Sequence, residues 1–174
     1  LFAHPIDLCS SLCDVGSGAG FPGIPLKLVR PDISLTIIES SGKRAMFLKE
    51  LARRLNIKDI KLIQGRAEEV EAGNREKYDI VTARAVARLN ILSEVCIPLV
   101  KINGWFIALK GQSGVEESKE AEKGIEELGC RLHKIQKFSF PRDQGIRQLL
   151  IYKKFKHTPP KYPRNYSQIK NKPL

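Results

Sequence analysis

Residues 13–23 read Cys-Asp-Val-Gly-Ser-Gly-Ala-Gly-Phe-Pro-Gly, and this glycine-rich stretch decides the fold. It overlaps the end of an apolar run, Ser11–Val15, that predicts a β-strand, so the glycines form a tight turn at the strand's carboxyl end. The fingerprint of dinucleotide-binding folds needs a small residue at position 21, where this chain has Phe21. A P-loop is excluded because no Gly-Lys-Ser/Thr follows at the required spacing. What remains is an acid followed by three alternating glycines: Gly16, Gly18 and Gly20.

A second acid strengthens the case for a ligand at this turn. Glu39 closes a continuous β-branched run, Leu35–Glu39, that predicts the next buried strand. A carboxylate at that position can accept hydrogen bonds from both hydroxyls of a ribose, although a surface glutamate at a strand end is the simpler alternative. Together the loop and the acid resemble an S-adenosylmethionine site, which has no pyrophosphate to accommodate.

Two more groups of residues follow predicted strands, at the edge where ligands bind in open α/β sheets. After the strand predicted over 60–64 comes Gly65-Arg-Ala-Glu68, which is well placed to contact an adenine. After the strand predicted over 78–83 comes Arg84, between two alanines. An arginine at that position indicates a binding group more than a structural salt bridge.

Apolar runs and helical patterns alternate along the chain, which predicts repeated β-α units and a mostly parallel sheet. We expect helices over 23–30, 43–56, 89–101 and 116–128, and strands over 11–15, 35–39, 60–64, 78–83 and 104–110. Two closing strands, 132–140 and 148–155, have too short a link for a crossover, so they form an antiparallel hairpin. This is the order of the Rossmann-like, seven-stranded methyltransferase sheet, in the α/β class.

The composition is that of an ordinary globular protein of one domain, with 42% hydrophobic and 28% charged residues. No apolar run reaches the roughly 20 residues that span a bilayer, and no signal peptide opens the chain, so we expect a cytoplasmic protein. Nothing in the sequence suggests an obligate oligomer, so we expect a monomer. The chain begins at Leu1 and has one methionine, Met46, so we expect it to be truncated at its N-terminus. The cysteines show no metal-binding spacing and indicate buried thiols, with no metal site: Cys9, Cys13, Cys96 and Cys130.

The net charge of +11 is concentrated towards the C-terminus. No acid follows Asp143, whereas the basic residues there are Arg147, Lys153, Lys154, Lys156, Lys161, Arg164, Lys170 and Lys172. We therefore divide the chain into a methyltransferase domain, 1–156, and a basic, extended tail, 157–174. Such a tail suits a polyanion such as RNA, or else is a solvated segment that maintains solubility. On the first interpretation, removing the tail weakens RNA binding and leaves cofactor binding intact.

The motifs that are missing narrow the chemistry. Ala83-Arg-Ala-Val86 stands where methyltransferases of exocyclic amines carry Asn/Asp-Pro-Pro-aromatic, and no Pro-Cys pair offers the nucleophile for pyrimidine C5. The three histidines lie outside the strand-end loops. We therefore expect no catalytic base, and guanine N7 suits such a site because it carries no proton. Alignment of the reactants would supply most of the catalysis, with Arg84 as a positioning group.

With these residues assembled, the chain closely resembles the 16S ribosomal RNA guanine-N7 methyltransferases, also called glucose-inhibited division protein B. The resemblance is carried by five segments: Asp14–Pro25, Glu39 to Leu48, Gly65–Glu68, Ala83–Ala87 and Ala108–Gly111, with Arg147 and Tyr162-Pro-Arg164 further on. It implies S-adenosylmethionine as cofactor and 16S ribosomal RNA or the small subunit as partner, and it adds Arg147 to Arg84 as a positioning group. Members usually begin with a helical segment that residues 1–10 do not supply.

The site residues follow from the glycine loop and from this resemblance. The predicted cofactor contacts are Gly16, Gly18, Gly20, Phe21, Glu39, Ala67, Glu68 and Arg84. The predicted RNA contacts are Arg66, Lys110, Arg147 and Arg164. Two other functions remain as alternatives: an RNA-binding module without turnover, and a methyltransferase that acts on a small molecule or a protein.

Overall fold

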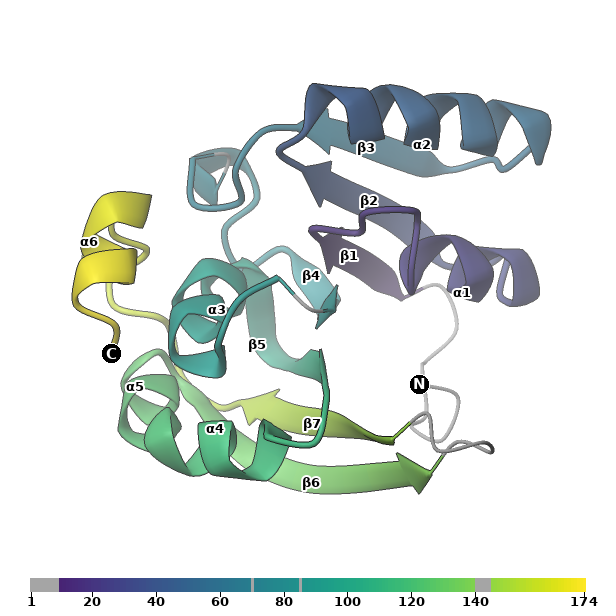
Figure 1. The fold of residues 1–174 in the computed structure, drawn as a ribbon. Coiled ribbons are helices and arrows are strands. Elements are labelled where there is room, and N and C mark those ends of the chain that lie inside the picture. Colours follow the sequence, from purple (N-terminus) through teal and green to yellow (C-terminus); the bar gives the residue numbers. More distant parts are fainter. Residues whose placement is uncertain (1–9, 70, 85, 140–144) are drawn as a thin grey trace.

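A computed structural model describes residues 10–69, 71–84, 86–139 and 145–174 of the chain. Seven strands form one sheet in the order β3-β2-β1-β4-β5-β7-β6 (Figure 1). The strands are β1 (Ser11–Val15), β2 (Ser34–Glu39), β3 (Ile60–Gln64), β4 (Tyr78–Arg84), β5 (Val100–Lys110), β6 (Cys130–Ser139) and β7 (Ile146–Lys154). The helices are α1 (Gly23–Val29), α2 (Gly42–Arg54), α3 (Leu89–Cys96), α4 (Gly114–Glu120), α5 (Glu122–Glu127) and α6 (Tyr166–Asn171), with 3-10 turns η1 (Glu71–Gly73) and η2 (Ile97–Leu99).

The pairing of the strands confirms the predicted fold. β1 to β5 pair in parallel, and β7 pairs antiparallel with both β5 and β6. The antiparallel hairpin follows from the short link after β6, although residues 140–144 of that link lie outside the described part of the chain. The parallel strands bring their carboxyl ends to one edge of the sheet, and that edge carries the predicted site.

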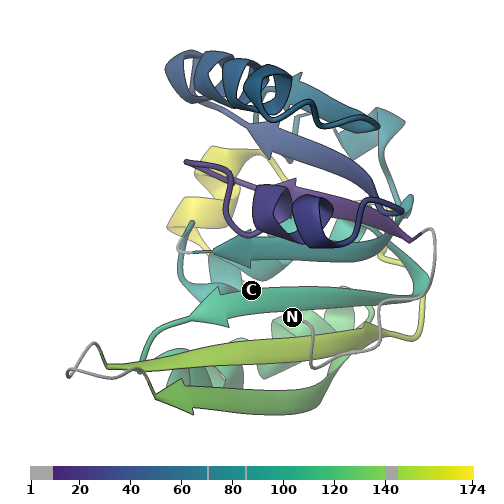
Figure 2. The ribbon, with the colours of Figure 1, turned by 90° about the vertical axis from the view of Figure 1, so that its right-hand side faces the viewer.

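Helices cover the two faces of the sheet, and the sheet divides the core in two (Figure 2). On one face α1 and α2 bury Ile24, Leu26 and Leu48 against β1 and β2. On the other face α3, α4, α5 and α6 pack residues such as Leu92 and Ile125 against the sheet. Cys13, Cys96 and Cys130 are buried free thiols, as predicted, whereas Cys9 lies outside the described residues. No helix within the described ranges is long and apolar enough to cross a membrane.

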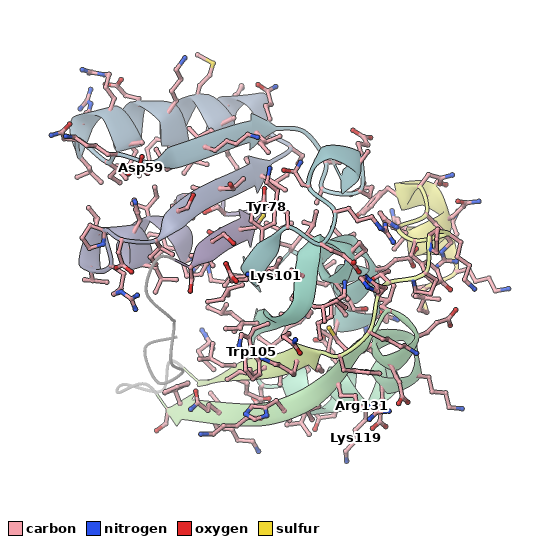
Figure 3. The ribbon with its side chains drawn as sticks, turned by 180° about the vertical axis from the view of Figure 1, so that it is seen from behind. Asp59, Tyr78, Lys101, Trp105, Lys119 and Arg131 are labelled. Atoms are coloured by element: carbon pink, nitrogen blue, oxygen red, sulfur yellow. The ribbon has the colours of Figure 1, made fainter. Side chains whose placement is uncertain are left out.

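The predicted boundary between the third helix and the fifth strand is wrong. The helix expected over 89–101 ends at Cys96, because Pro98 has no N–H to donate and the chain continues as η2. β5 then starts at Val100, not at Gly104, and its register with β4 shifts before Trp105. Asn103 has a positive φ of 62° within this shift, between Lys101 and Trp105 on the strand (Figure 3). The helix expected over 116–128 is likewise divided, into α4 and α5, at Ala121.

The segment after β7 differs from the extended tail that the sequence predicted. It contains α6, and it inserts Tyr162 and Ile169 into the core beside α3. Arg164 lies between them and pairs with Glu94, whose side chain is fully buried on α3, at 2.6 Å between Nη2 and Oε2. The sequence did not predict this packing, because prolines and basic residues dominate the segment. Its two core residues, Tyr162 and Ile169, are too far apart to show a helical or strand periodicity.

A buried ion pair joins the end of β7 to the turn between η1 and β4, and to the start of this segment. The fully buried Lys154 ammonium lies 2.9 Å from Glu76 Oε1 and donates to the carbonyl of Ile97 (3.0 Å) and to Thr158 Oγ1 (2.9 Å). Burial lowers the pKa of Lys154, against the opposing effect of Glu76. Burial also raises the pKa of Glu76, but hydrogen bonds from Lys154, the Thr158 N–H and His157 outweigh that effect and hold it at about 2.

We predict that this pair makes stability depend on acid pH. A carboxyl whose pKa is lowered by folding stabilises the protein at pH values above its ordinary pKa of 4.5. That contribution is lost as the pH falls from 4.5 towards the folded-state pKa of about 2. Glu76→Gln is expected to lower the free energy of unfolding by about 3 kcal/mol at pH 6, since it leaves Lys154 buried without its counter-ion. The difference from the unsubstituted chain should shrink steadily between pH 5 and pH 2 in urea unfolding.

Glu120→Gln is the matched control, because Glu120 pairs with Arg88 on the surface, where both side chains are more than half exposed. It should change the free energy of unfolding by less than about 1 kcal/mol. A Glu76→Gln effect as small as that of the control, at every pH, would contradict a stabilising pair at Lys154.

Candidate active site

The glycine loop is held in place by the buried carboxylate of Asp14, at the end of β1. Asp14 is fully buried, and its Oδ2 accepts hydrogen bonds from Ser17 Oγ (2.5 Å) and the Gly23 N–H (2.9 Å). Its Oδ1 accepts one from Thr82 Oγ1 on β4 (2.9 Å). Burial raises the pKa of Asp14, whereas these three hydrogen bonds and the charge of Arg84 lower it. The acid of the glycine motif therefore faces inward and fixes the loop.

Two glycines of the loop are required by its backbone. Gly16 and Gly18 have positive φ values of 65° and 61°, which side chains rarely adopt. A Cβ on Gly16 would also lie 2.7 Å from Cγ2 of Val86, so the loop and the segment after β4 approach closely. The backbone of the loop is thereby brought directly to the edge of the sheet.

Glu39 meets this loop from the end of β2. Its side chain is buried, with Oε2 accepting from the Gly18 N–H (3.1 Å) and Oε1 from the Ser41 N–H (3.0 Å). Each oxygen has a second lone pair, so the carboxylate can accept further hydrogen bonds from a diol. Glu39 thus has two tasks that are compatible: it fixes the Gly18 turn and it presents acceptors to a ligand.

A cavity of about 340 Å³ opens at this edge, between the ends of β1, β2, β3 and β4. This volume is within the range of small-molecule sites. Predicted residues in its wall are Gly16, Glu39, Arg66, Ala67 and Glu68. Residues that were not predicted to lie there include Arg44 on α2, Val86, Ile91, Leu92 and Val95 around α3, and Tyr166 on α6.

Glu68 supplies an unused acceptor in the wall. Its side chain is 5% exposed, and its Oε1 is buried without accepting a hydrogen bond from the described residues. The nearest cation, Arg66 Nη1, is 3.7 Å from that oxygen. A buried carboxylate oxygen without a hydrogen bond is costly, so the site is complete only when a donor reaches it. The exocyclic amine of an adenine is such a donor, and Glu39 can accept from the ribose that would accompany it.

Other predicted cofactor residues lie outside the wall of this cavity. Arg84 is exposed at the end of β4, with its guanidinium carbon 5.4 Å from the centre of the Phe21 ring. Phe21 is itself 49% exposed. Gly18 and Gly20 shape the loop behind Gly16 and do not line the cavity. Arg84 and Phe21 therefore form a separate exposed pair next to the loop.

The predicted RNA contacts divide into two kinds. Arg147 and Arg66 are exposed, with Arg147 donating only to the adjacent Ile146 carbonyl among its hydrogen bonds within the described residues. Lys110, by contrast, is 8% exposed, donates to the Ala87 carbonyl (2.5 Å) and pairs with Glu117 (2.7 Å). Arg164 is engaged by Glu94 in the same manner. These partners give Lys110 and Arg164 structural tasks that the sequence did not predict, and they argue against free RNA contacts there.

The seven-stranded order, the acid-anchored glycine loop after β1 and the carboxylate at the end of β2 define a Rossmann-like methyltransferase that uses S-adenosylmethionine. The chain belongs to the GidB family, described as rRNA small subunit methyltransferase G, whose sequence model matches residues 3–149.

Relatives with the name ribosomal RNA small subunit methyltransferase G are found in several bacteria. The one from Staphylococcus carnosus is 50% identical over 167 residues, which cover 94% of this chain and 70% of the relative. The one from Lactobacillus acidophilus is 48% identical over 167 residues, covering 95% of this chain and 70% of the relative.

Solved structures share the fold at much lower identity. A variant of the 16S rRNA (adenine(1408)-N(1))-methyltransferase from Catenulisporales acidiphilia has a TM-score of 0.69 and 13% identity, over 86% of this chain and 87% of that one. The M. jannaschii protein TYW2, in complex with AdoMet, has a TM-score of 0.66 and 16% identity, over 87% of this chain and 70% of that one. These likenesses confirm the methyltransferase sheet.

We predict that Glu39→Ala lowers the affinity for S-adenosylmethionine by at least about tenfold. The substitution removes charge-assisted hydrogen bonds worth about 1.5 to 3 kcal/mol and frees the Gly18 N–H that Glu39 now holds. Isothermal titration calorimetry measures the change. Glu69→Ala is the control, because Glu69 is an exposed carboxylate next to the site that does not line the cavity. If Glu39→Ala and Glu69→Ala bind S-adenosylmethionine with equal affinity, Glu39 does not bind the cofactor.

Proposed function

We propose that this chain transfers a methyl group from S-adenosylmethionine to N7 of a guanine in 16S ribosomal RNA. The observation that carries this proposal is a cavity with acceptors for the cofactor and no base for the target. Among its described lining residues none is a histidine or a cysteine, and we assign its two carboxylates, Glu39 and Glu68, to the cofactor. The family and its relatives, named for the small subunit RNA, support the choice of substrate.

Burial argues against a thiol nucleophile. Cys13 and Cys96 are fully buried in the same core cluster, and burial raises the pKa of both thiols. A neutral, inaccessible thiol cannot attack a pyrimidine carbon. Methylation at pyrimidine C5 therefore has no support among the described residues.

S-adenosylmethionine, when bound, supplies the methyl group on a sulfonium that is an excellent leaving group. The residues of the chain then have three tasks. Glu39 accepts from the ribose, Glu68 accepts from the adenine amine, and the backbone around Gly16 packs against the rest of the cofactor. Guanine N7 offers a lone pair and releases no proton, so holding it in line with the methyl group supplies most of the catalysis.

The exposed arginines, Arg84 and Arg147, are better suited to bind RNA phosphates than to contact the target guanine. Methylation at N7 makes the guanine cationic, so a guanidinium stacked on that base would oppose the reaction. Arg84 and Arg147 are exposed and can meet the backbone on either side of a base that is splayed from an RNA loop. We assign both to positioning of the RNA.

The other features of the chain fit this function. Free, buried thiols and a ribosomal substrate support action in the cytoplasm. We propose that residues 157–174 belong to the same folded unit as the preceding methyltransferase domain, because Tyr162 and Ile169 lie in its core.

The product is the direct test. Methylated small-subunit RNA, digested to nucleosides and analysed by mass spectrometry, should contain 7-methylguanosine. Since no proton leaves, the rate of the chemical step should vary little between about pH 6.5 and 8.5 while RNA and cofactor remain bound. A methyl group on an exocyclic amine, a pyrimidine carbon or a ribose would overturn the proposal.

A second prediction concerns exposed lysines of the C-terminal segment. Lys170→Gln with Lys172→Gln should reduce the slope of log affinity for RNA against log salt by about one to two, since each lost phosphate contact releases about one fewer counter-ion. Affinity for S-adenosylhomocysteine should stay the same. Lys58→Gln, an exposed lysine between α2 and β3, is the control for charge alone. If Lys58→Gln reduces the slope as much per lost charge as the double substitution does, the segment makes no specific RNA contact.

A further inference from the structure

The C-terminal helix α6 reaches the cofactor cavity. Tyr166, its first residue, is half-buried and lines the cavity together with Leu92 and Val95 of α3. α6 lies beside α3, far in sequence from the glycine loop but at the same edge of the sheet (Figure 1). The wall thus includes an aromatic ring from a segment for which the sequence indicated only RNA binding or solubility.

Arg66 connects this ring to the predicted adenine contacts. The Arg66 guanidinium carbon lies 4.4 Å from the centre of the Tyr166 ring, and its Nη1 is 3.7 Å from Glu68 Oε1. Arg66 therefore occupies one face of the ring and links it to the segment after β3, where Ala67 and Glu68 lie in the same wall. The remaining surface of the ring is available to a ligand at that end of the cavity.

Several contacts fix α6, so the ring has a defined position. Asn165 caps the helix by accepting from the Gln168 N–H (3.0 Å), and Ile169 is completely buried. Arg164, just before the helix, pairs with the buried Glu94 of α3. Upstream, Arg75 donates to the carbonyls of Tyr162 (2.8 Å) and Thr158 (2.7 Å). A loosely attached tail would not keep an aromatic ring at a cavity wall.

We propose that Tyr166 binds the cofactor, by contact of its ring with the adenine, and that Arg66 is a positioning residue that holds Tyr166. This inference rests on the proposed use of the cavity for S-adenosylmethionine. It moves Arg66 from the predicted RNA contacts to the support of the cofactor site. It also reverses one expectation from the sequence, because removal of residues 157–174 would take away part of the cofactor site.

The test compares ligand affinities by calorimetry. Tyr166→Ala is expected to weaken binding of S-adenosylhomocysteine about tenfold, which is typical for loss of an aromatic contact with a base. Tyr166→Phe, which keeps the ring, should stay within about twofold of the unsubstituted chain. Tyr166→Leu, which keeps apolar bulk for folding, should fall between them. Gln168→Ala, at an exposed site on the same helix, is the matched control and should have no effect.

A second ligand locates the effect on the cofactor. 5′-Methylthioadenosine has the adenosine part and lacks the amino acid, so Tyr166→Ala should weaken its binding by the same factor. Arg66→Ala should weaken both ligands, and combining it with Tyr166→Ala should add little further loss, because the two residues act as a unit.

The outcomes are distinguishable. If the unsubstituted chain binds S-adenosylhomocysteine and both Tyr166→Ala and Tyr166→Leu bind it equally well, the assignment of Tyr166 is wrong and the proposed function stands. A loss for S-adenosylhomocysteine with none for 5′-methylthioadenosine would overturn the contact with adenine. Absence of binding by the unsubstituted chain would overturn the cofactor assignment and this inference together.

Discussion

The Asp14 carboxylate, fully buried under the glycine loop, accepts three hydrogen bonds that join β1 to the loop, to α1 and to β4. Burying a carboxylate is expensive, and these hydrogen bonds offset that cost only while the loop keeps its shape. The loop in turn delivers the Gly18 N–H to Glu39. The conformation of the site is therefore largely established by folding, and little of the binding free energy is needed to order it.

The sequence predicted best where a local pattern and the tertiary structure agree. β1 and β3 have the predicted bounds because each is a short stretch of strand-forming residues ended by a turn. Glu39 and Glu68 lie in one cavity because parallel strands end at one edge. The start of β5 was missed because Pro98 and the positive φ of Asn103 act together across a register shift. No local pattern could place Tyr166 in the site, since its contacts come from α3 and from the loop after β3.

Charge was the least reliable guide, because a sequence shows a cation without its partner. Lys154 contributes to the basic C-terminal run, yet it is completely buried against Glu76. Arg164 and Lys110 are similarly committed to Glu94 and Glu117. A count of basic residues therefore overstates the positive surface of this chain. The cations that remain exposed, such as Arg147 and Lys170, are the more informative ones for RNA.

The contacts of the C-terminal segment also have a consequence for the order of folding. The hydrogen bond from Arg75 to Tyr162 spans 87 residues, and the pair between Arg164 and Glu94 spans 70. Closing such long loops is entropically unfavourable until both partners are already held in place. The segment can therefore dock only onto a sheet and an α3 that have formed, so the last wall of the cavity is completed in a late step. The ability to bind a ligand in this cavity then indicates that the whole domain has folded.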